Sequence, residues 1–145
     1  MEADREKLNL GRLFLNAFRW LDAGFCALMN EKGWPDVPKT NSLVFPHLLV
    51  GGIRPAEIAR RAGVSRQAVH QVLADLKEMG LVELRADPLD RRAKLVFPTP
   101  LGLEFDRAVG DSAERVEKVL ADRIGEDRVT ALRESLEADW GRPLG

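Results

Sequence analysis

Residues 8–29 carry apolar side chains at steps of three and four positions, which is the spacing of an amphipathic helix. The apolar surface is wider than a single stripe, because Phe18, Trp20 and Met29 extend it. A helix that is apolar on more than one side usually packs against more than its own domain. We therefore predict a long helix here that contributes to an interface with a second chain. The regularly spaced positions are Leu10, Leu13, Phe14, Ala17, Leu21, Phe25 and Leu28.

A second helix is predicted to begin at Asn41 or Ser42, because either residue is a good N-cap. Its apolar residues continue to Leu49, and the glycines that follow at 51–52 end it. Pro46 fits in the first turn of this helix or else bends it.

Residues 54–80 have the pattern of a helix-turn-helix, a short helix followed by a turn and a longer helix. Pro55 suits the first position of the short helix, and Gly63 suits its end. Ser65 is a good N-cap for the longer helix, which ends at Gly80. The predicted inward-facing residues are Ile58, Ala59 and Ala62 in the first helix and Val69, Val72, Leu73, Leu76 and Met79 in the second.

Two short apolar and β-branched runs, 82–86 and 94–98, predict a hairpin joined by the sequence DPLDRR. A hairpin directly after a helix-turn-helix is a wing. Thr99 and Pro100 then start a helix with coiled-coil-like spacing that breaks at Gly125, before a last helix. The predicted fold class is mostly α with a small β-hairpin wing (α+β), a winged helix-turn-helix with a helical dimerisation region. The apolar seam comprises Phe105, Val109, Ser112, Val116 and Val119, and then Val129, Leu132, Leu136 and Trp140.

The composition is that of a soluble globular chain of 145 residues, long enough for one domain with its own core. No apolar run approaches the ~18–20 residues that span a bilayer, so we expect no membrane partner. Cys26 is the single cysteine, which excludes an intramolecular disulfide and fits a reducing cytoplasm. With two histidines in addition, a structural metal site is not expected, and no cofactor is predicted.

The near-neutral net charge of −1 hides an uneven distribution along the chain. Residues 1–53 are balanced, with 6 basic and 6 acidic side chains. Residues 54–98 carry 9 basic and 6 acidic side chains, whereas residues 101–145 carry 7 basic and 11 acidic ones. A middle segment with excess positive charge indicates contact with a polyanion, provided that its basic side chains share one surface.

The outer face of the longer helix at 65–80 offers the side chains that read DNA bases. Arg suits guanine and Gln suits adenine in the major groove, while small residues allow close approach. Ser65, at the cap of the helix, suits a phosphate. An ordinary polar surface helix is the alternative interpretation of the same face. The candidate DNA-binding residues are Ser65, Arg66, Gln67, Ala68, His70 and Gln71.

The predicted wing adds basic residues to this helix. Arg91 and Arg92 lie at or near the hairpin tip, where guanidinium groups are able to enter a minor groove. Asp90 is positioned to pair with Arg92 and fix its direction. Arg85, on the first predicted strand, completes the candidate set. A loop with an ordinary surface ion pair is the alternative.

Residues 54–102 resemble the winged helix-turn-helix of the multiple-antibiotic-resistance regulator (MarR) family. The most specific part is DPLDRRAKLVFPTPLG at 87–102, which is similar to the family's wing and the Thr-x-x-Gly start of its next helix. The order of helices on both sides also fits. The resemblance implies a single domain over 1–145, with 41–99 as the DNA-binding part and 6–32 and 100–141 as the dimerisation part.

The same resemblance implies a homodimer on double-stranded DNA with a pseudo-palindromic operator. Each subunit would place one recognition helix in the major groove and one wing in the minor groove, with Arg92 as the minor-groove arginine and Asp90 as its partner. Family members usually repress transcription and leave DNA when a small aromatic or phenolic ligand binds, or when a cysteine is oxidised. We therefore expect a homodimeric repressor with a small-molecule effector.

Candidate ligand-binding residues are aromatic and apolar, in keeping with the usual lining of small-molecule sites. They are Phe14, Phe18, Trp20, Phe45 and His47. A redox-responsive regulator that uses Cys26 is an alternative, although no base lies within one helical turn to lower the pKa of the thiol. A small buried apolar role fits Cys26 better.

Enzymatic activity is not expected, because the sequence shows no nucleophile with its base and no glycine-rich nucleotide loop. A winged helix that binds protein instead of DNA is the remaining alternative, since a fold does not determine a function. The basic, Gln-containing face and the wing arginines favour DNA.

Overall fold

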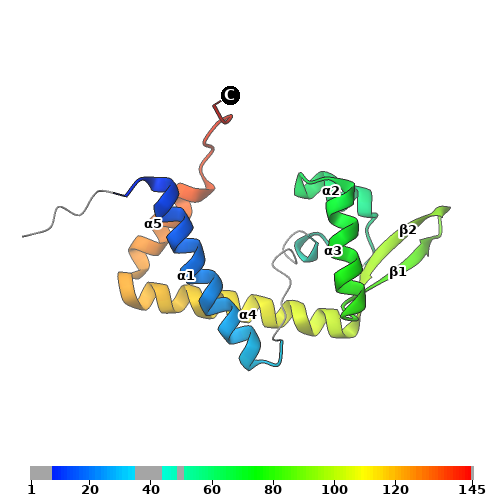
Figure 1. Ribbon diagram of the computed structural model, residues 1–145, viewed down its shortest axis with the longest axis horizontal. Coiled ribbons are helices and arrows are strands. Elements are labelled where there is room, and N and C mark those ends of the chain that lie inside the picture. Colours follow the sequence, from blue (N-terminus) through cyan, green and yellow to red (C-terminus); the bar gives the residue numbers. More distant parts are fainter. Residues whose placement is uncertain (1–7, 35–43, 49–50, 145) are drawn as a thin grey trace, which may run out of the picture. The chain divides into compact units, whose positions relative to one another are not determined.

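The computed structural model describes residues 8–34, 44–48 and 51–144 and is mostly helical with one β-hairpin (Figure 1). This confirms the predicted fold class. The chain divides into two compact units. We call Cys26–Gly110 the winged-helix unit, and Met1–Phe25 together with Asp111–Gly145 the helical unit. The elements in chain order are α1 (Leu10–Glu31), η2 (Phe45–His47), α2 (Pro55–Ala62), α3 (Arg66–Glu78), β1 (Val82–Asp87), β2 (Asp90–Pro98), α4 (Pro100–Ile124) and α5 (Glu126–Glu137).

The helix-turn-helix of α2 and α3 forms where the sequence predicts it, and its turns have clear local causes. Pro55 opens α2, and Gly63 closes it in the left-handed conformation (φ 66°, ψ 31°) that glycine adopts without strain. Ser65 then caps α3, with its Oγ accepting a hydrogen bond from the Ala68 N–H at 3.1 Å. Gly80, with φ 74°, follows the end of α3, and the Leu81 N–H donates to the Leu76 carbonyl.

The hairpin is longer than its sequence pattern predicts. Strand β2 begins at Asp90 and not at residue 94, so the connection shrinks to Pro88 and Leu89. The strands pair antiparallel from Val82 opposite Pro98, and the register breaks between Ala86 and Asp87. An isolated bridge joins Ile53 to Val96 of β2, with N–H to O distances of 3.2 and 2.8 Å. A one-residue bridge has no periodicity, so no sequence pattern predicts it.

The start of α4 is fixed by a side-chain cap and by close backbone contact. The Thr99 hydroxyl accepts a hydrogen bond from the Gly102 N–H at 3.0 Å and donates one to the Gly80 carbonyl at 2.5 Å. Gly102 lies so close to the chain that a Cβ there would be 1.9 Å from the Leu81 carbonyl oxygen. The Thr-x-x-Gly sequence therefore joins α4 to the segment between α3 and β1.

The predicted second helix is wrong for the residues that the structure describes. Phe45–His47 form one 3₁₀ turn, η2, with Val44 as its N-cap, and Leu48 is already extended (φ −68°, ψ 132°). Pro46 lies at the start of this turn, where it needs no N–H partner, but it prevents a longer helix from running through it. The proposed starts at Asn41 or Ser42, and Leu49, lie outside the described residues.

The core of the winged-helix unit is closed around Phe105 of α4, which is fully buried. Phe45 of η2 packs on it with ring centroids 5.2 Å apart, and Trp34 meets it edge-on at 5.1 Å. These aromatic contacts attach η2 and the segment after α1 to α4 within the unit. The buried apolar residues of this unit are Met29, Val44, Phe45, Ile53, Ile58, Ala59, Val69, Val72, Leu73, Leu76, Leu81, Val82, Val96 and Phe105.

The helical unit contains the first part of α1, the last part of α4 and α5, and it buries little. Val116 and Ser112 of α4 are buried, and Gly24 of α1 lies against Val116, where a Cβ would be 3.3 Å from Cγ2. Every residue of α5 is exposed except Val129, which is half-buried. An apolar groove of about 200 Å³ lies among Leu21, Glu117, Leu120, Val129, Leu132, Arg133, Leu136 and Glu137.

Candidate nucleic-acid interface

Helix α3 separates its apolar and polar residues onto opposite faces, as its spacing predicts. Val69, Val72, Leu73 and Leu76 are buried, and they fix the direction of the helix in the unit. The opposite face consists of the predicted base-reading side chains, and Ala68 beside them is half-buried. These exposed residues are Arg66, Gln67, His70 and Gln71.

Two arginines on the exposed surface of helix α2 are held by one carboxylate. Glu57 accepts hydrogen bonds from Arg60 at 2.5 and 2.8 Å and from Arg61 at 2.9 Å. The bond from Arg60, followed by that from Arg61, lowers the pKa of Glu57 to about 2. Glu57 therefore stays ionised and holds both guanidinium groups in place at neutral pH.

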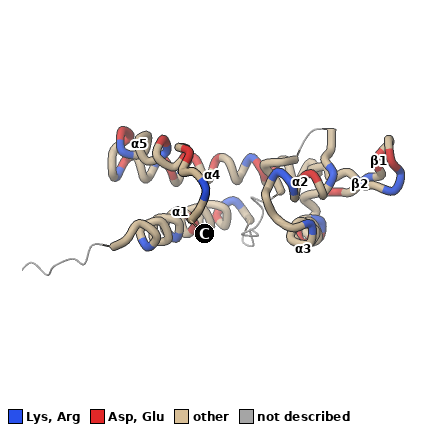
Figure 2. The backbone as a smooth tube through the Cα atoms, turned by 90° about the horizontal axis from the view of Figure 1, so that it is seen from above, with Lys and Arg blue, Asp and Glu red and all other residues tan. Residues whose placement is uncertain are grey.

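A surface hollow of about 480 Å³ lies between α2 and the start of α3. Its basic lining comes from Arg54, Arg60 and Arg66, with Glu57 as the acidic member. Figure 2 shows Lys and Arg positions on α2, on α3 and toward the end of the hairpin. The excess positive charge of the middle segment is thus displayed at the surface of the winged-helix unit.

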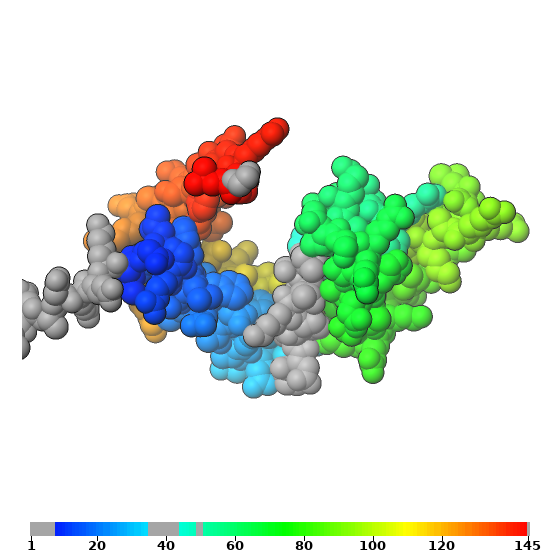
Figure 3. All heavy atoms as spheres, turned by 45° about the horizontal axis from the view of Figure 1, so that its top comes forward, coloured from blue at the N-terminus to red at the C-terminus, as the bar shows by residue number. Residues whose placement is uncertain are grey.

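The hairpin projects from the winged-helix unit beside its helices (Figure 3). Arg91 and Arg92 are exposed and lie on the first residues of β2, next to the turn and not in a loop. Leu89 at the turn is 95% exposed. Arg85 on β1 is engaged by its neighbours, because its guanidinium pairs with Glu83 and lies 4.4 Å from the centre of the Phe97 ring.

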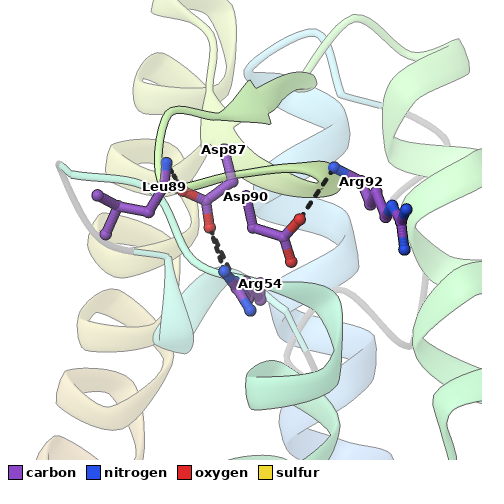
Figure 4. Close-up of polar contacts among 5 residues, drawn as sticks. All are labelled: Arg54, Asp87, Leu89, Asp90 and Arg92. Atoms are coloured by element: carbon purple, nitrogen blue, oxygen red, sulfur yellow. Dashed lines mark hydrogen bonds and ion pairs between the residues drawn. The ribbon is translucent and has the colours of Figure 1, made fainter.

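The predicted ion pair between Asp90 and Arg92 is corrected by the structure. The Asp90 carboxylate accepts a hydrogen bond from the backbone N–H of Arg92 at 3.1 Å. The Arg92 guanidinium extends away from Asp90 (Figure 4), and among the described residues no ion pair joins the two. A two-residue separation favours a local turn of the aspartate onto the backbone, which competes with pairing of the side chains. Asp90 therefore shapes the start of β2.

The aspartate that does form an ion pair in the wing is Asp87, which the sequence analysis missed. Its Oδ2 accepts hydrogen bonds from Arg54 Nε at 2.9 Å and Nη2 at 2.6 Å, and its Oδ1 accepts one from the Leu89 N–H at 2.9 Å. The Leu89 N–H, followed by Arg54, holds the pKa of Asp87 below its ordinary value. Arg54 and Asp87 are 33 positions apart, so no local pattern signals their contact.

The five predicted ligand-binding residues fall in two different units. Phe14, Phe18 and Trp20 are exposed on α1 in the helical unit, where Phe14 packs on Trp140 with ring centroids 5.9 Å apart. Phe45 belongs to the core of the winged-helix unit, and His47 beside it is half-buried. Ligand binding at these residues stays a prediction.

Cys26 is half-buried on α1, and its redox role also stays a prediction. Within the described part of the chain, no three His, Cys, Asp or Glu side chains are grouped to hold a metal ion. None of the described helices is both long and apolar enough to cross a membrane.

Comparison with known proteins shows what the winged helix is similar to. Residues 40–93 match the family model described as the MarR family. Two curated relatives, the uncharacterized proteins Rv2011c of Mycobacterium tuberculosis (strain ATCC 25618 / H37Rv) and Mb2034c of Mycobacterium bovis, are each 39% identical over 80 residues. These matches cover 55% of this chain and 56% of the relatives, so they span little more than half of the length of either.

Solved structures share the fold over most of the chain. The S. aureus MepR–DNA complex has a TM-score of 0.71 at 16% identity, covering 90% of this chain and 95% of that one. A MarR-family transcriptional regulator from Rhodococcus sp. RHA1 has a TM-score of 0.68 at 19% identity, covering 94% and 96%. The crystal structure of MarR has a TM-score of 0.67 at 21% identity, covering 94% and 90%. The family match and the shared fold agree with the resemblance carried by residues 87–102: the winged helix is similar to that of the MarR family, and the chain has the fold of winged-helix regulators of that family.

Proposed function

We propose that this protein is a sequence-specific DNA-binding transcription regulator that acts as a homodimer. The observation that carries the proposal is the exposed face of α3, with two wing arginines in the same compact unit. A protein of the same fold, S. aureus MepR, has been solved in complex with DNA, which supports this use of the fold.

The exposed face of α3 reads base edges in the major groove. Arg66 has the donors for guanine, and Gln67 and Gln71 have the donor and acceptor pair that matches adenine. His70 lies one turn after Arg66 on the same face. The buried stripe on the other side of α3 keeps these four side chains in a fixed direction.

Phosphates bind around the start of α3 and set the position of the helix. The Ser65 oxygen is used by the Ala68 N–H, and its own O–H remains available to a phosphate oxygen. The hollow beside it is lined by Arg54, Arg60 and Arg66, which supply charge but no base specificity. Binding is therefore expected to weaken as salt rises.

The wing contacts the minor groove through Arg91 and Arg92. Both are exposed and next to the turn, and a guanidinium is attracted there by the negative potential of a narrow groove. Arg85 acts on the phosphate side and does not enter the groove, because Glu83 and Phe97 hold its guanidinium at the strand.

The homodimer is supported by the apolar surface of the helical unit. Phe18 is 62% exposed, and large apolar side chains on α1, α4 and α5 are exposed with it. Large apolar side chains exposed in such number on one unit favour an interface there. Two copies related by a two-fold axis would read a pseudo-palindromic operator.

Repression and release by a small aromatic or phenolic ligand complete the proposed function. Phe14, Phe18, Trp20, Phe45 and His47 are the candidate ligand-binding residues. A ligand that binds one arrangement of the dimer more tightly than the DNA-competent one lowers DNA affinity by that difference. Screening aromatic acids and phenols by tryptophan fluorescence and DNA affinity tests this part.

Selection of bound sequences from random DNA by the purified protein tests the central part. The expected outcome is one enriched, pseudo-palindromic operator that binds at least a hundredfold more tightly than a scrambled duplex at the same salt. Titration at several salt concentrations should show log affinity falling linearly with log salt. No enrichment together with no salt-dependent binding contradicts the proposal and favours a winged helix that binds protein.

A further inference from the structure

The end of the hairpin is held to α2 by side chains. Asp87 is the last residue of β1, and Arg54 is the N-cap residue of α2. Figure 4 shows the Asp87 carboxylate between the Arg54 guanidinium and the backbone of Leu89. One carboxylate thus contacts both the turn of the wing and the first residue of the helix-turn-helix. We call this contact the wing clamp.

The wing clamp uses both carboxylate oxygens in a nearly closed site. Oδ2 accepts two hydrogen bonds from Arg54 and Oδ1 accepts one from Leu89, and Asp87 is only 5% exposed. Charge-assisted bonds that use two donors of one guanidinium restrict direction as well as distance. The Arg54 side chain remains partly exposed, so its charge is not lost to the surface.

The backbone ladder does not provide the same restraint at this end of the hairpin. Ala86 pairs with Lys94, but the next pair is Asp87 with Asp90, which leaves Arg91 to Ala93 opposite no partner. A bulge of this kind bends the strand and re-aims its side chains. Both wing arginines lie inside it, so their direction depends on how the end of the hairpin is held.

We propose that Asp87 and Arg54 are positioning residues that hold the wing arginines in the direction needed to meet DNA while α3 occupies the major groove. The inference rests on the proposed function, because it concerns the geometry of the same DNA interface. It adds one acidic residue, Asp87, to that interface and gives Arg54 a second role beside its place in the phosphate-binding hollow. Asp87 contributes without touching DNA.

The direction of the change in DNA affinity distinguishes a positioning role of Asp87 from a purely electrostatic one. A carboxylate beside a polyanion repels it, so removing the Asp87 charge should tighten DNA binding if charge alone matters. If Asp87 positions the wing, the same change should weaken binding. Asp87→Asn is a suitable variant, because the amide keeps one acceptor oxygen but cannot hold both Leu89 and Arg54 as the carboxylate does.

The experiment compares affinities for the selected operator and a scrambled duplex at a fixed salt concentration. Asp87→Asn is expected to bind the operator about tenfold more weakly, the size of one lost groove contact. Glu78→Gln, at the exposed end of α3, is the matched control, since it removes an equal charge outside the wing clamp and should bind equally well or more tightly. Thermal unfolding followed by circular dichroism shows that both variants are folded at the assay temperature.

A second readout tests whether the effect passes through Arg92. If the wing clamp positions this arginine, Arg92→Ala should weaken operator binding much less in the Asp87→Asn background than in the wild type. A role in overall stability alone would leave the two losses independent, and their fold-changes would multiply. Arg54→Lys, which keeps the charge but loses the two-bond geometry, should fall between the wild type and Asp87→Asn.

The outcomes separate the inference from the proposed function. If the wild type binds its operator and Asp87→Asn binds it as tightly or more tightly, the positioning role is wrong while the proposed function stands. Independent losses for Asp87→Asn and Arg92→Ala overturn it in the same way. If the wild type binds no DNA, the proposed function fails and the inference fails with it.

Discussion

The winged-helix unit and the helical unit differ in how many of their apolar side chains are buried. The first buries fourteen apolar residues, Phe105 among them, whereas in the second Val116 is the one buried apolar residue among those described. Large apolar residues that are exposed are few in the winged-helix unit and many in the helical unit. In the winged-helix unit they are Leu89, Leu101 and Leu103, and in the helical unit they are Leu8, Leu10, Leu13, Phe14, Leu15, Phe18, Trp20, Ile124, Leu132, Leu136, Trp140 and Leu144.

This difference separates a unit that completes its own core from one that lacks part of its core. Burial of apolar area is the main favourable term in folding, so exposed leucines and phenylalanines in such number mark a surface that gains by association. The winged-helix unit keeps its exposed side chains mainly polar, and the proposed DNA-binding residues are among them. We infer that one unit provides the DNA surface and the other brings two such surfaces together.

The largest expected effect is on the closed core, through Gly102. In Gly102→Ala, the new Cβ would lie 1.9 Å from the Leu81 carbonyl oxygen, a contact that the backbone can relieve only by moving. We expect a loss of about 3–5 kcal/mol in the free energy of unfolding, or failure to fold. Urea unfolding followed by circular dichroism measures it.

Gly110→Ala is the matched control on the same helix, because nothing lies within 4 Å of its Cβ position. Alanine favours a helix interior over glycine, so this variant should gain about 0.5–1 kcal/mol. Equal effects of the two substitutions would show that the contact between α4 and Leu81 does not have the geometry described here.

The second-largest expected effect is on the dissociation constant of the proposed dimer, through the helical unit. Phe18→Glu places a charge on the exposed apolar face of α1, where Phe18 is 62% exposed. A buried charge at the centre of an interface should cost about 2 kcal/mol or more, and thus raise the dimer dissociation constant by about thirtyfold or more. Sedimentation at several protein concentrations measures this constant.

Leu89→Glu is the control, since Leu89 is also a large, exposed apolar residue but lies at the turn of the wing. It should leave the dimer dissociation constant unchanged. A wild-type chain that sediments as a folded monomer at micromolar concentration would rule out the dimer and the contrast drawn between the units.

The third effect divides the surface of the winged-helix unit by role. Gln71→Ala should change the preferred base at one operator position and cost about 1–3 kcal/mol there. Arg92→Ala should weaken binding to operator and scrambled duplexes alike and flatten the salt dependence by about one unit of slope, with base preference intact. Titrations over several salt concentrations, combined with repeated sequence selection, measure both.

An unchanged affinity and salt slope in Arg92→Ala would remove the wing from the DNA interface. An unchanged base preference in Gln71→Ala would do the same for the middle of α3. Together, these two results would mean that the winged-helix unit folds as described but binds a partner other than DNA.

The smallest effect is a titration on the surface of α2. The pKa of Glu57 is lowered to about 2, so its pairs with Arg60 and Arg61 add stability above pH ~4.5, and this is lost as the pH falls toward 2. NMR titration of the Glu57 carboxyl group should show this low midpoint. Arg60→Gln should raise it, because the Arg60 hydrogen bond is the main cause. Arg128→Gln, on α5, should leave the midpoint unchanged.

The sequence predicted the elements whose signals are local. The helix-turn-helix follows from Pro55, Gly63 and Ser65, and the structure gives each the predicted role. The same holds for the buried stripe of α3 and for its exposed face. The start of α4 at Thr99 and Pro100 is equally local, since a hydroxyl cap and a proline act within one turn.

The elements that sequence reasoning missed depend on distant partners or on competition between local options. The Ile53–Val96 bridge and the Arg54–Asp87 pair join positions that no short window contains. The Asp90 carboxylate lies two residues before Arg92 and accepts a hydrogen bond from the backbone N–H of Arg92, not from the Arg92 guanidinium. At Pro46 the apolar spacing indicated a helix that begins at Asn41 or Ser42, but the missing N–H of a proline disfavours a helix that runs through it from an earlier start.

The mass of the protein–DNA complex tests the central claim most directly, because it depends on both units at once. Light scattering on the selected operator should give two chains on one duplex that carries two half-sites about 10 base pairs apart. A duplex cut to a single half-site should lose most of this affinity. One chain per duplex, with equal affinity for the whole and the halved operator, would contradict the account, because the helical unit would then not join two winged-helix units on DNA.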